Sequence, residues 1–202
     1  MFDFVDTMLG FDACAIYSGY IIITANLAEK IEIADAILIG AGSGLSSAAG
    51  YDHYHWSPAL LKALAQFQEY YKFPSPFAGF YHCFSSYGAQ WAYYSQYIRF
   101  MWEAPIGQPY LDLKKAVGSK PAFILTTNVD MQVSRLFSKE QVCTFQGDFG
   151  FCQCSQPCHD QIWTNYGLVQ RLTQALDGVK LPEEMVPRCP DCGRVLIPWV
   201  RD

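Results

Sequence analysis

The stretch 34–50, ADAILIGAGSGLSSAAG, decides the fold. Its first part, 34–39, is a short apolar run, which is typical of a strand buried on both faces of a parallel sheet. The run meets a loop of small residues, 40–50, whose glycines let backbone N–H groups approach an anion closely. The N-terminus of a following helix would add favourable partial charge. The pattern predicts an α/β protein with a phosphate-binding loop. A tight structural turn is the alternative, because Leu45 occupies the last glycine position of the dinucleotide fingerprint.

A second buried-strand pattern, AFILT at 122–126, is followed at once by polar residues. Polar groups at the carboxyl end of a parallel strand face the ligand crevice of an open α/β sheet. Asn128 and Asp130 alternate with Val129, so both side chains would point the same way from an extended backbone. We therefore expect them at a ligand site, with helix capping after the strand as the alternative.

Helical patterns occupy three other parts of the chain. Residues 24–34 have helical composition, and 163–176 form a helix-like piece. Nearly half of the aromatic residues lie within 67–102, whose second half repeats Trp91, Tyr94 and Ile98 at helical spacing. This segment predicts an aromatic helical core. Alternatively, some of its rings also line a substrate cleft.

The cysteines form two close pairs, C-x3-C and C-x2-C, made by Cys154, Cys158, Cys189 and Cys192. Four thiolates suit a tetrahedral structural zinc ion and leave no position open for water. Cys152 is a rival for Cys154, and His159 could replace a sulfur. The alternative to a zinc site is a set of buried free cysteines that act as small hydrophobic residues.

Composition excludes several classes of protein. Hydrophobic residues make up 51% and charged residues 16%, which argues against disorder, and a net charge of −5 gives no basic footprint for nucleic acid. The start of the chain has no basic region of a secretory signal, and the apolar run 13–23 is too short to span a membrane. We expect a soluble protein of the reducing cytoplasm, where eight cysteines favour metal binding.

Four motifs, in this order, resemble those of the sirtuin (Sir2-like) family: GAGSGLSSAAGYD at 40–52, TTNVD at 126–130, FQGDFGFCQC at 145–154 and PRCPDCGRVLIP at 187–198. The resemblance implies a Rossmann-like parallel sheet flanked by helices, with a small zinc-binding module and with the C-terminal part of the fold missing. It implies an NAD-binding domain over 1–150 with an aromatic helical insertion at about 55–105. Residues 151–202 would be the zinc-binding module and the start of the return to the large domain.

The resemblance also implies roles for individual residues. The cofactor-binding set for NAD would be Gly40, Ala41, Gly42, Ser43, Gly44, Asp52, Thr127, Asn128 and Asp130. Asn128 would contact the nicotinamide ribose, and Asp130 would hold the nicotinamide carboxamide. Asp52 matches the acidic residue of the loop with an offset of one, and Thr127 replaces the usual glutamine. The four paired cysteines would hold Zn²⁺.

Gln146 stands where the family has its catalytic histidine. A glutamine amide cannot take a proton at neutral pH. His53 and His55, near the glycine loop, are candidates to replace that base, and a surface or capping role is the alternative for both.

The pattern resembles the macrodomain-linked microbial branch, the class M sirtuins, which is associated with protein mono-ADP-ribosylation. We therefore predict an NAD-dependent ADP-ribosyltransferase with Asn128, Asp130 and Gln146 as its catalytic residues. Its partner would be an acceptor protein, such as a lipoylated carrier. The alternatives are a protein lysine deacylase and an inactive NAD- and zinc-binding fragment. A partner chain or a second copy would cover the open sheet edge, and residues 1–23 would be an N-terminal extension.

Overall fold

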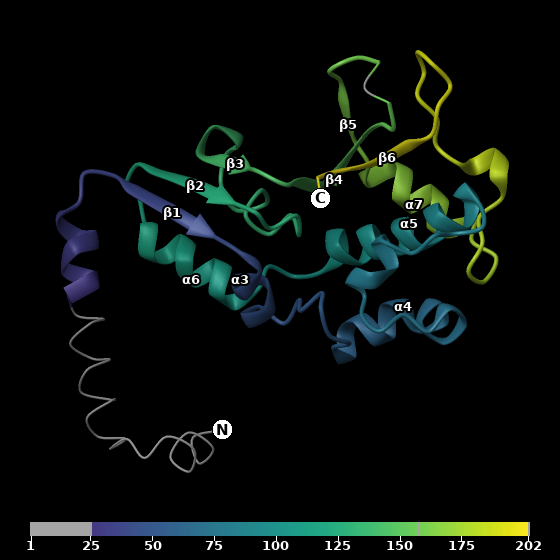
Figure 1. Ribbon diagram of the computed structural model, residues 1–202. Helices are drawn as coiled ribbons and strands as arrows, with labels where there is room; N and C mark the ends of the chain where they lie inside the picture. The colour runs from purple at the N-terminus through teal and green to yellow at the C-terminus, as the bar shows by residue number, and fades with distance from the viewer. Residues whose placement is uncertain (1–25, 157, 202) are drawn as a thin grey trace, which may run out of the picture.

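The computed structural model describes residues 26–156 and 158–201, which form two three-stranded sheets with helices packed around them (Figure 1). The expected N-terminal extension, 1–23, lies outside the described residues. One sheet is parallel and carries the glycine loop, and the other is antiparallel and carries the cysteine pairs. The two sheets lie end to end, with the aromatic helices below the antiparallel sheet in Figure 1.

The parallel sheet has the order β1 (Ile37–Ala41), β2 (Ala122–Thr126) and β3 (Val142–Thr144). Both apolar runs of the sequence therefore form neighbouring strands, and the α/β prediction is confirmed. The segment predicted as a loop is mostly regular structure, because β1 continues to Ala41 and the helix α3 (Ser43–Ala48) starts directly after Gly42. The helix α6 (Gln108–Val117) leads into β2.

Only one face of the parallel sheet is covered by the described residues. A small core on that face includes Tyr110 and Val117 of α6 packed on Ile124. On the opposite face, Leu38 is 71% exposed and Phe123 is 41% exposed. The prediction that these strands are buried on both faces is wrong for the described part of the chain, because an apolar run does not reveal what covers it.

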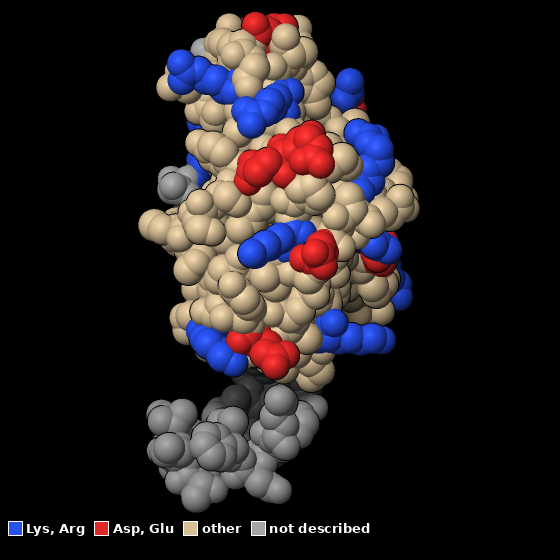
Figure 2. Space-filling model, turned by 90° about the vertical axis from the view of Figure 1, so that its right-hand side faces the viewer, with Lys and Arg blue, Asp and Glu red and all other residues tan. Residues whose placement is uncertain are grey.

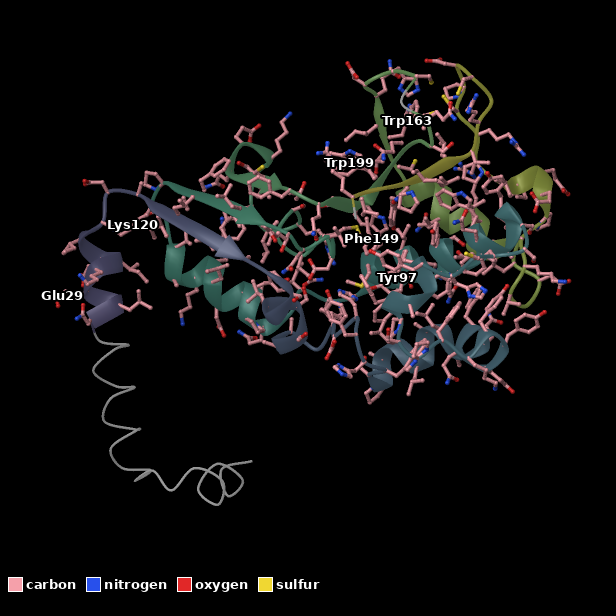
Figure 3. All side chains as sticks on the ribbon, in the orientation of Figure 1. Glu29, Tyr97, Lys120, Phe149, Trp163 and Trp199 are labelled. Atoms are coloured by element: carbon pink, nitrogen blue, oxygen red, sulfur yellow. The ribbon has the colours of Figure 1, made fainter. Side chains whose placement is uncertain are left out.

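A helical segment at 26–33 flanks the start of β1, as its composition predicted. Lys120 lies at this end of the sheet, as Figure 3 shows, and its Nζ donates to the carbonyl oxygens of Glu32 at 2.7 Å and Ala34 at 3.0 Å. A cation at a helix C-terminus satisfies carbonyl groups that have no partner in the helix. The contact therefore fixes the helix against the chain segment that leads into β2.

The aromatic segment forms α4 (Pro58–Tyr71), the short helix η1 (Phe77–Phe80) and α5 (Tyr87–Glu103). Ser57 and Ser86 cap the two long helices, each accepting a hydrogen bond from a backbone N–H three residues later. Trp91 and Ile98 are completely buried, so the prediction of an aromatic helical core is confirmed.

The antiparallel sheet has β4 (Gly147–Cys154) between β5 (Ile162–Thr164) and β6 (Leu196–Val200). Two short 3₁₀ helices, η2 (Lys139–Gln141) and η3 (Glu183–Met185), precede β3 and the second cysteine pair. The helix predicted at 163–176 is shorter than expected. Its first residues belong to β5, and α7 (Tyr166–Gln174) follows.

The aromatic helices and the cysteine-bearing segment share one hydrophobic core. The indole of Trp91 donates to the carbonyl oxygen of Leu196 on β6 at 2.8 Å. The strand β4 crosses residue 150, where the sequence analysis placed a domain boundary. That division stays a prediction. In the structure the helices within 58–103 pack in one core with residues that follow 150.

None of the described helices combines the length and apolarity that crossing a membrane would require. Figure 2 shows one end of the molecule, where blue Lys and Arg residues stand among red Asp and Glu residues on a mostly uncharged surface. On the described part of this face the basic residues do not merge into one patch.

Gly147 is the first residue of β4, just after the chain leaves β3 of the parallel sheet. We predict that Gly147→Ala is destabilising. Gly147 has φ +86, and a Cβ there would overlap the carbonyl group of Trp199 on β6. We expect the free energy of unfolding to fall by at least about 1–3 kcal/mol, measured by urea denaturation. The control is Gly44→Ala, whose Cβ meets nothing within 4 Å. Equal urea midpoints for both variants would contradict this account of Gly147.

Candidate functional site

A cavity of about 540 Å³ lies where the carboxyl end of β2 meets the aromatic helices. Its walls come from 127–129 after β2, from the start of α3, from residues around η1, from one face of α5 and from the end of β6. Tyr97 and Phe149, labelled in Figure 3, lie on this wall with ring centroids 5.4 Å apart. The wall thus combines aromatic rings with polar side chains from several segments, among them those at the end of β2.

Asn128 links the strand end to the glycine loop. Its Nδ2 donates to the carbonyl oxygen of Gly42 at 2.9 Å and to the hydroxyl of Tyr110 at 3.1 Å. Its backbone N–H donates to Oγ1 of Thr126 at 2.9 Å. Two side-chain bonds and one backbone bond hold Asn128 in one orientation on the cavity wall.

Asp130 lies behind this wall and is 1% exposed. Its Oδ2 accepts hydrogen bonds from Ser46 at 2.6 Å and from Tyr110 at 2.7 Å, and its Oδ1 accepts from the backbone N–H of Gln132 at 3.1 Å. Ser46 itself lines the cavity. Asp130 therefore meets the cavity through Ser46 in this structure, and its direct contact with a ligand stays a prediction.

Tyr110 is a part of the site that sequence reasoning missed. Its hydroxyl contacts Asn128 and Asp130 and lies 3.2 Å from Oγ of Ser46. Burial raises the pKa of Tyr110, and the neighbouring Asp130 raises it further, so the phenol stays protonated and can donate. No motif surrounds Tyr110, and its aromatic character alone predicts only a core position.

The glycine loop borders a second cavity of about 590 Å³ beside α3, lined by Gly40, Ala41, Gly42, Ser43 and Gly44 among others. Ser43 lines both cavities, so the two are neighbours. A Cβ added to Gly40 or Gly44 would meet nothing within 4 Å, and neither residue has a positive φ. Neither protein packing nor backbone conformation requires glycine there. The missing side chains leave open space above the loop, which favours a ligand site over a tight structural turn.

Thr127 and Gln146 face the first cavity from two sides. The backbone N–H of Thr127 donates to the carbonyl oxygen of Ala41 at 3.1 Å, which continues the pairing of β1 and β2. The carbonyl oxygen of Gln146 accepts from the backbone N–H of Arg201 at 2.9 Å. Arg201 also lines the cavity and brings the single guanidinium among its described lining residues. Sequence reasoning did not identify Arg201.

Asp52 is not among the residues that line either cavity. It accepts hydrogen bonds from the backbone N–H of Tyr54 at 2.9 Å and from Nδ1 of His55 at 2.8 Å. Its slight burial acts to raise the pKa of Asp52, but these hydrogen bonds lower it overall. His55 is largely exposed, as its surface or capping alternative predicts. A cofactor contact by Asp52 stays a prediction.

His53, in contrast, lies on the cavity wall. Its Nδ1 forms a hydrogen bond with the hydroxyl of Tyr97 on α5. Burial lowers the pKa of His53, against the opposing effects of Asp130 and Asp52. The ring is therefore neutral at pH 7, and its surroundings differ from those of the exposed His55.

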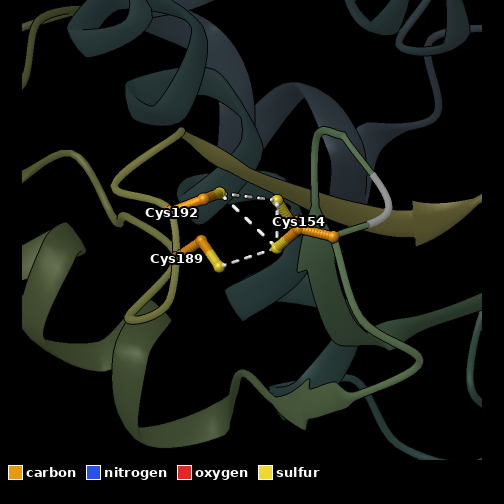
Figure 4. Close-up of side chains that lie close together, drawn as sticks. Cys154, Cys189 and Cys192 are labelled. Carbon is orange, nitrogen blue, oxygen red and sulfur yellow. Dashed lines mark hydrogen bonds between the residues drawn. The ribbon is translucent and has the colours of Figure 1, made fainter.

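The sulfurs of Cys154, Cys158, Cys189 and Cys192 all lie within 4.8 Å of one another, and Figure 4 shows them around one point. Their closest separations are 3.4 to 3.7 Å. A tetrahedral zinc ion with Zn–S bonds of about 2.3 Å places its sulfurs about 3.8 Å apart. The donor set therefore fits one structural zinc ion, with no ligand position left for water.

The two rival ligands lie outside this group of four. The thiol of Cys152 points to the carbonyl oxygen of Trp163 at 3.6 Å. Nε2 of His159 lies 3.2 Å from the sulfur of Cys189. When this nitrogen carries a proton, it can donate a hydrogen bond to the thiolate form of Cys189. Burial acts against ionisation, but hydrogen bonds from the backbone N–H groups of Cys192 and Asp191 and from His159 lower the pKa of Cys189 to about 6. The geometry favours Cys154 over Cys152.

We predict that Cys189→Ser removes the metal and loosens the antiparallel sheet. Structural zinc contributes folding free energy directly, on the order of 10 kcal/mol in small zinc domains. The expected result is a zinc content well below one equivalent, by elemental analysis, and a lower melting temperature.

The control for this prediction is Cys83→Ser, because Cys83 is exposed and lies outside the group. It should keep the parent's zinc content and melting temperature. If Cys189→Ser kept a full equivalent of zinc, the four-sulfur site would be wrong.

No family model matches the chain. The chain is 34% identical over 168 residues to a protein ADP-ribosyltransferase of Staphylococcus aureus (strain Mu50), an alignment that covers 82% of the chain and 53% of that protein. It is 30% identical over 184 residues to a probable bifunctional ADP-ribose hydrolase/ADP-ribosyltransferase of Fusarium oxysporum f. sp. cubense, covering 86% of the chain and 30% of that protein. The chain thus spans about half or less of the length of these relatives.

Two solved structures share the fold. A mutant Sir2 homologue in complex with ADP ribose aligns with a TM-score of 0.55 at 17% identity, over 87% of this chain and 61% of its own. A Sir2 homologue in complex with NAD aligns with a TM-score of 0.53 at 17% identity, over 87% of this chain and 60% of its own. With the parallel sheet, the glycine loop and the four cysteines in place, the chain has the Sir2 fold over the part that it shares with these structures.

Proposed function

We propose that the chain is the NAD-binding and zinc-binding part of a sirtuin-type protein mono-ADP-ribosyltransferase. The observation that carries this proposal is the open glycine loop, which Asn128 ties to the 540 Å³ cavity through the carbonyl oxygen of Gly42. The names of the two relatives, both ADP-ribosyltransferases, support the type of reaction. The solved Sir2 homologues with NAD and with ADP ribose support the ligand.

In this proposal the glycine loop, 40–44, receives the NAD pyrophosphate through its backbone N–H groups. Thr127 and Asn128 contact the nicotinamide ribose in the 540 Å³ cavity. Asp130 acts through Ser46, which it holds by the 2.6 Å hydrogen bond. Asp52, in the loop between α3 and α4, is proposed as a further cofactor contact. The zinc ion holds the ends of β4 and β6 together and takes no part in the reaction.

Bound NAD supplies the ADP-ribosyl group and a nicotinamide leaving group. The protein's part is to orient the C1′ carbon of the ribose toward the acceptor and to exclude water. Phe80 and Phe149, with stacked rings 4.9 Å apart, give the cavity a dry wall. Gln146 lies on the wall as an amide, so it orients a ligand group by hydrogen bonding and takes no proton.

The proposed partner is an acceptor protein. Tyr54, Phe77 and Tyr81 are exposed aromatic residues that line the cavity, with Phe77 5.0 Å from Tyr54 and 4.9 Å from Tyr81 between ring centroids. Such a rim suits an apolar arm, which supports a lipoylated carrier as the acceptor. A reducing cytoplasm suits both this acceptor and a thiolate zinc site.

A second contact is proposed for the open side of the parallel sheet. The exposed Leu38 and Phe123 form an apolar face there, and β1 is an edge strand. Exposed apolar faces and open edges tend to be covered by other segments or chains. A partner chain or a second copy would shield this face.

We predict that Asn128→Ala abolishes transfer while the zinc site stays loaded. The change removes the amide that contacts both the loop and the cavity, and the loss of one such donor costs roughly 100- to 1,000-fold in rate. Two quantities are measured: nicotinamide release from NAD and the mass increase of a lipoylated carrier protein. The zinc content of the same enzyme sample is determined alongside. Gln108→Ala is the control, since this exposed amide donates to Asp112 and lines neither cavity.

Other outcomes favour the alternatives. Acyl removal from lysine peptides, with an O-acyl-ADP-ribose product and no change in carrier mass, would indicate a deacylase. No NAD binding by calorimetry in a protein with one equivalent of zinc would indicate an inactive binding module. Unchanged turnover in Asn128→Ala would remove this residue from the site.

A further inference from the structure

One polar atom on the wall of the 540 Å³ cavity has no hydrogen-bond partner among the described residues. It is Nε2 of His53, which is buried. The other such atom in the described chain, Nε2 of Gln132, belongs to a residue that lines neither cavity. Buried polar atoms are normally paired, so an unpaired one on a cavity wall points to a ligand as its partner.

The imidazole of His53 is held in a fixed position. Its Nδ1 is engaged by the hydroxyl of Tyr97, and its ring lies 5.8 Å from the Tyr97 ring. Tyr97 is buried in α5 and packs edge-on against Phe80 and Phe149. With Nδ1 occupied and the ring immobilised, Nε2 is the atom of this lining residue that remains without a partner among the described residues.

The ionisable groups near this ring favour a neutral imidazole. Burial lowers the pKa of His53, and the two carboxyl groups that oppose this effect are Asp52, its chain neighbour, and Asp130 behind Ser46. Burial also raises the pKa of Tyr97, so the phenol is protonated. A neutral imidazole with its Nδ1–H donated to the Tyr97 oxygen has a lone pair on Nε2, which is the form that a general base needs.

The other lining residues do not offer this function. Gln146 carries an amide, and Arg201 carries a guanidinium, which has donors and no acceptor. The remaining ionisable side chains on the described wall are tyrosines, whose hydroxyl groups are suited to donate hydrogen bonds rather than to take a proton. Among the described lining residues, His53 is therefore the one side chain that can accept a proton near pH 7.

We propose that His53, oriented by Tyr97, is the general base that takes the proton of the acceptor during ADP-ribosyl transfer, an inference that rests on the proposed function. The C1′–N bond of NAD breaks, and its electron pair stays on the nitrogen of nicotinamide. The nucleophilic atom of the acceptor bonds to C1′, and its proton passes to Nε2 of His53. The imidazolium donates Nδ1–H to Tyr97 and later releases the Nε2 proton to solvent.

The proposal also restricts the chemistry of the acceptor. A base is useful only if the attacking atom carries a proton, as in a hydroxyl, an amine or a thiol. A carboxylate acceptor has no such proton. The modified residue is therefore expected to be a protic nucleophile rather than Asp or Glu.

The test compares His53→Gln with the matched control His55→Gln in the zinc-loaded protein. His53→Gln keeps hydrogen-bonding capacity but cannot take a proton. We expect its transfer rate at pH 7 to fall at least about 100-fold while NAD affinity by calorimetry changes little. His55 is exposed, and His55→Gln should keep the parent's rate.

The pH profile separates a base from a structural residue. The parent's transfer rate should fall as the pH drops through the lowered pKa of His53, because the imidazolium has no lone pair. This acidic limb should be absent from the residual activity of His53→Gln. In Tyr97→Phe, which keeps the ring and removes the hydroxyl, the limb should shift in pH while zinc content is kept.

The outcomes distinguish the two proposals. A parent protein that modifies no acceptor overturns the proposed function and this inference together. An active parent with an unimpaired His53→Gln overturns only the role of His53. If His53→Gln fails to fold, Tyr97→Phe decides, and an acidic limb that stays at the parent's pH in this variant overturns the base.

Discussion

The rest of the site depends on the hydrogen bonds made by the buried carboxyl group of Asp130. A polar group this deeply buried is stable only if its hydrogen bonds are made. Asp130 obtains them from Ser46 of α3, Tyr110 of α6 and the backbone of Gln132. These partners come from three segments that are distant in sequence. Satisfying one carboxyl group therefore fixes the glycine loop, the helix before β2 and the end of β2 relative to one another.

Two hydrophobic cores meet next to Asp130, one under the parallel sheet and one among the aromatic helices. The parallel sheet contributes backbone groups and open space above the glycine loop, and the aromatic helices contribute rigid walls. The segment after β2 belongs to both, since it carries Asn128 and then leads through β3 into β4. The cavity lies at this junction, with the polar strand end on one side and aromatic rings on the other. A site of this kind suits a ligand with an anionic part and a flat ring.

Local patterns in the sequence predicted the elements that local forces specify. The apolar runs gave β1 and β2, helical spacing gave α5, and close cysteine pairs gave the group of four sulfurs. Packing across the chain was not predictable in this way. Tyr110 meets Ser46 and Tyr97 meets His53 across many residues, and nothing near these residues signals the contact. The one-sided cover of the parallel sheet was missed for the same reason, because hydrophobicity alone does not name the covering element.

The two sheets differ in how far apart in sequence their paired strands lie, and this difference bears on the order of folding. In the parallel sheet Ile37 pairs with Ala122, so a long loop must close before the first contact forms. In the antiparallel sheet Cys152 pairs with Trp163 across a short connection, and the four cysteines lie near its ends. Pairing of low contact order forms faster than pairing of high contact order. We therefore expect the half with the four cysteines to assemble first and to serve as the template on which the half with the glycine loop closes.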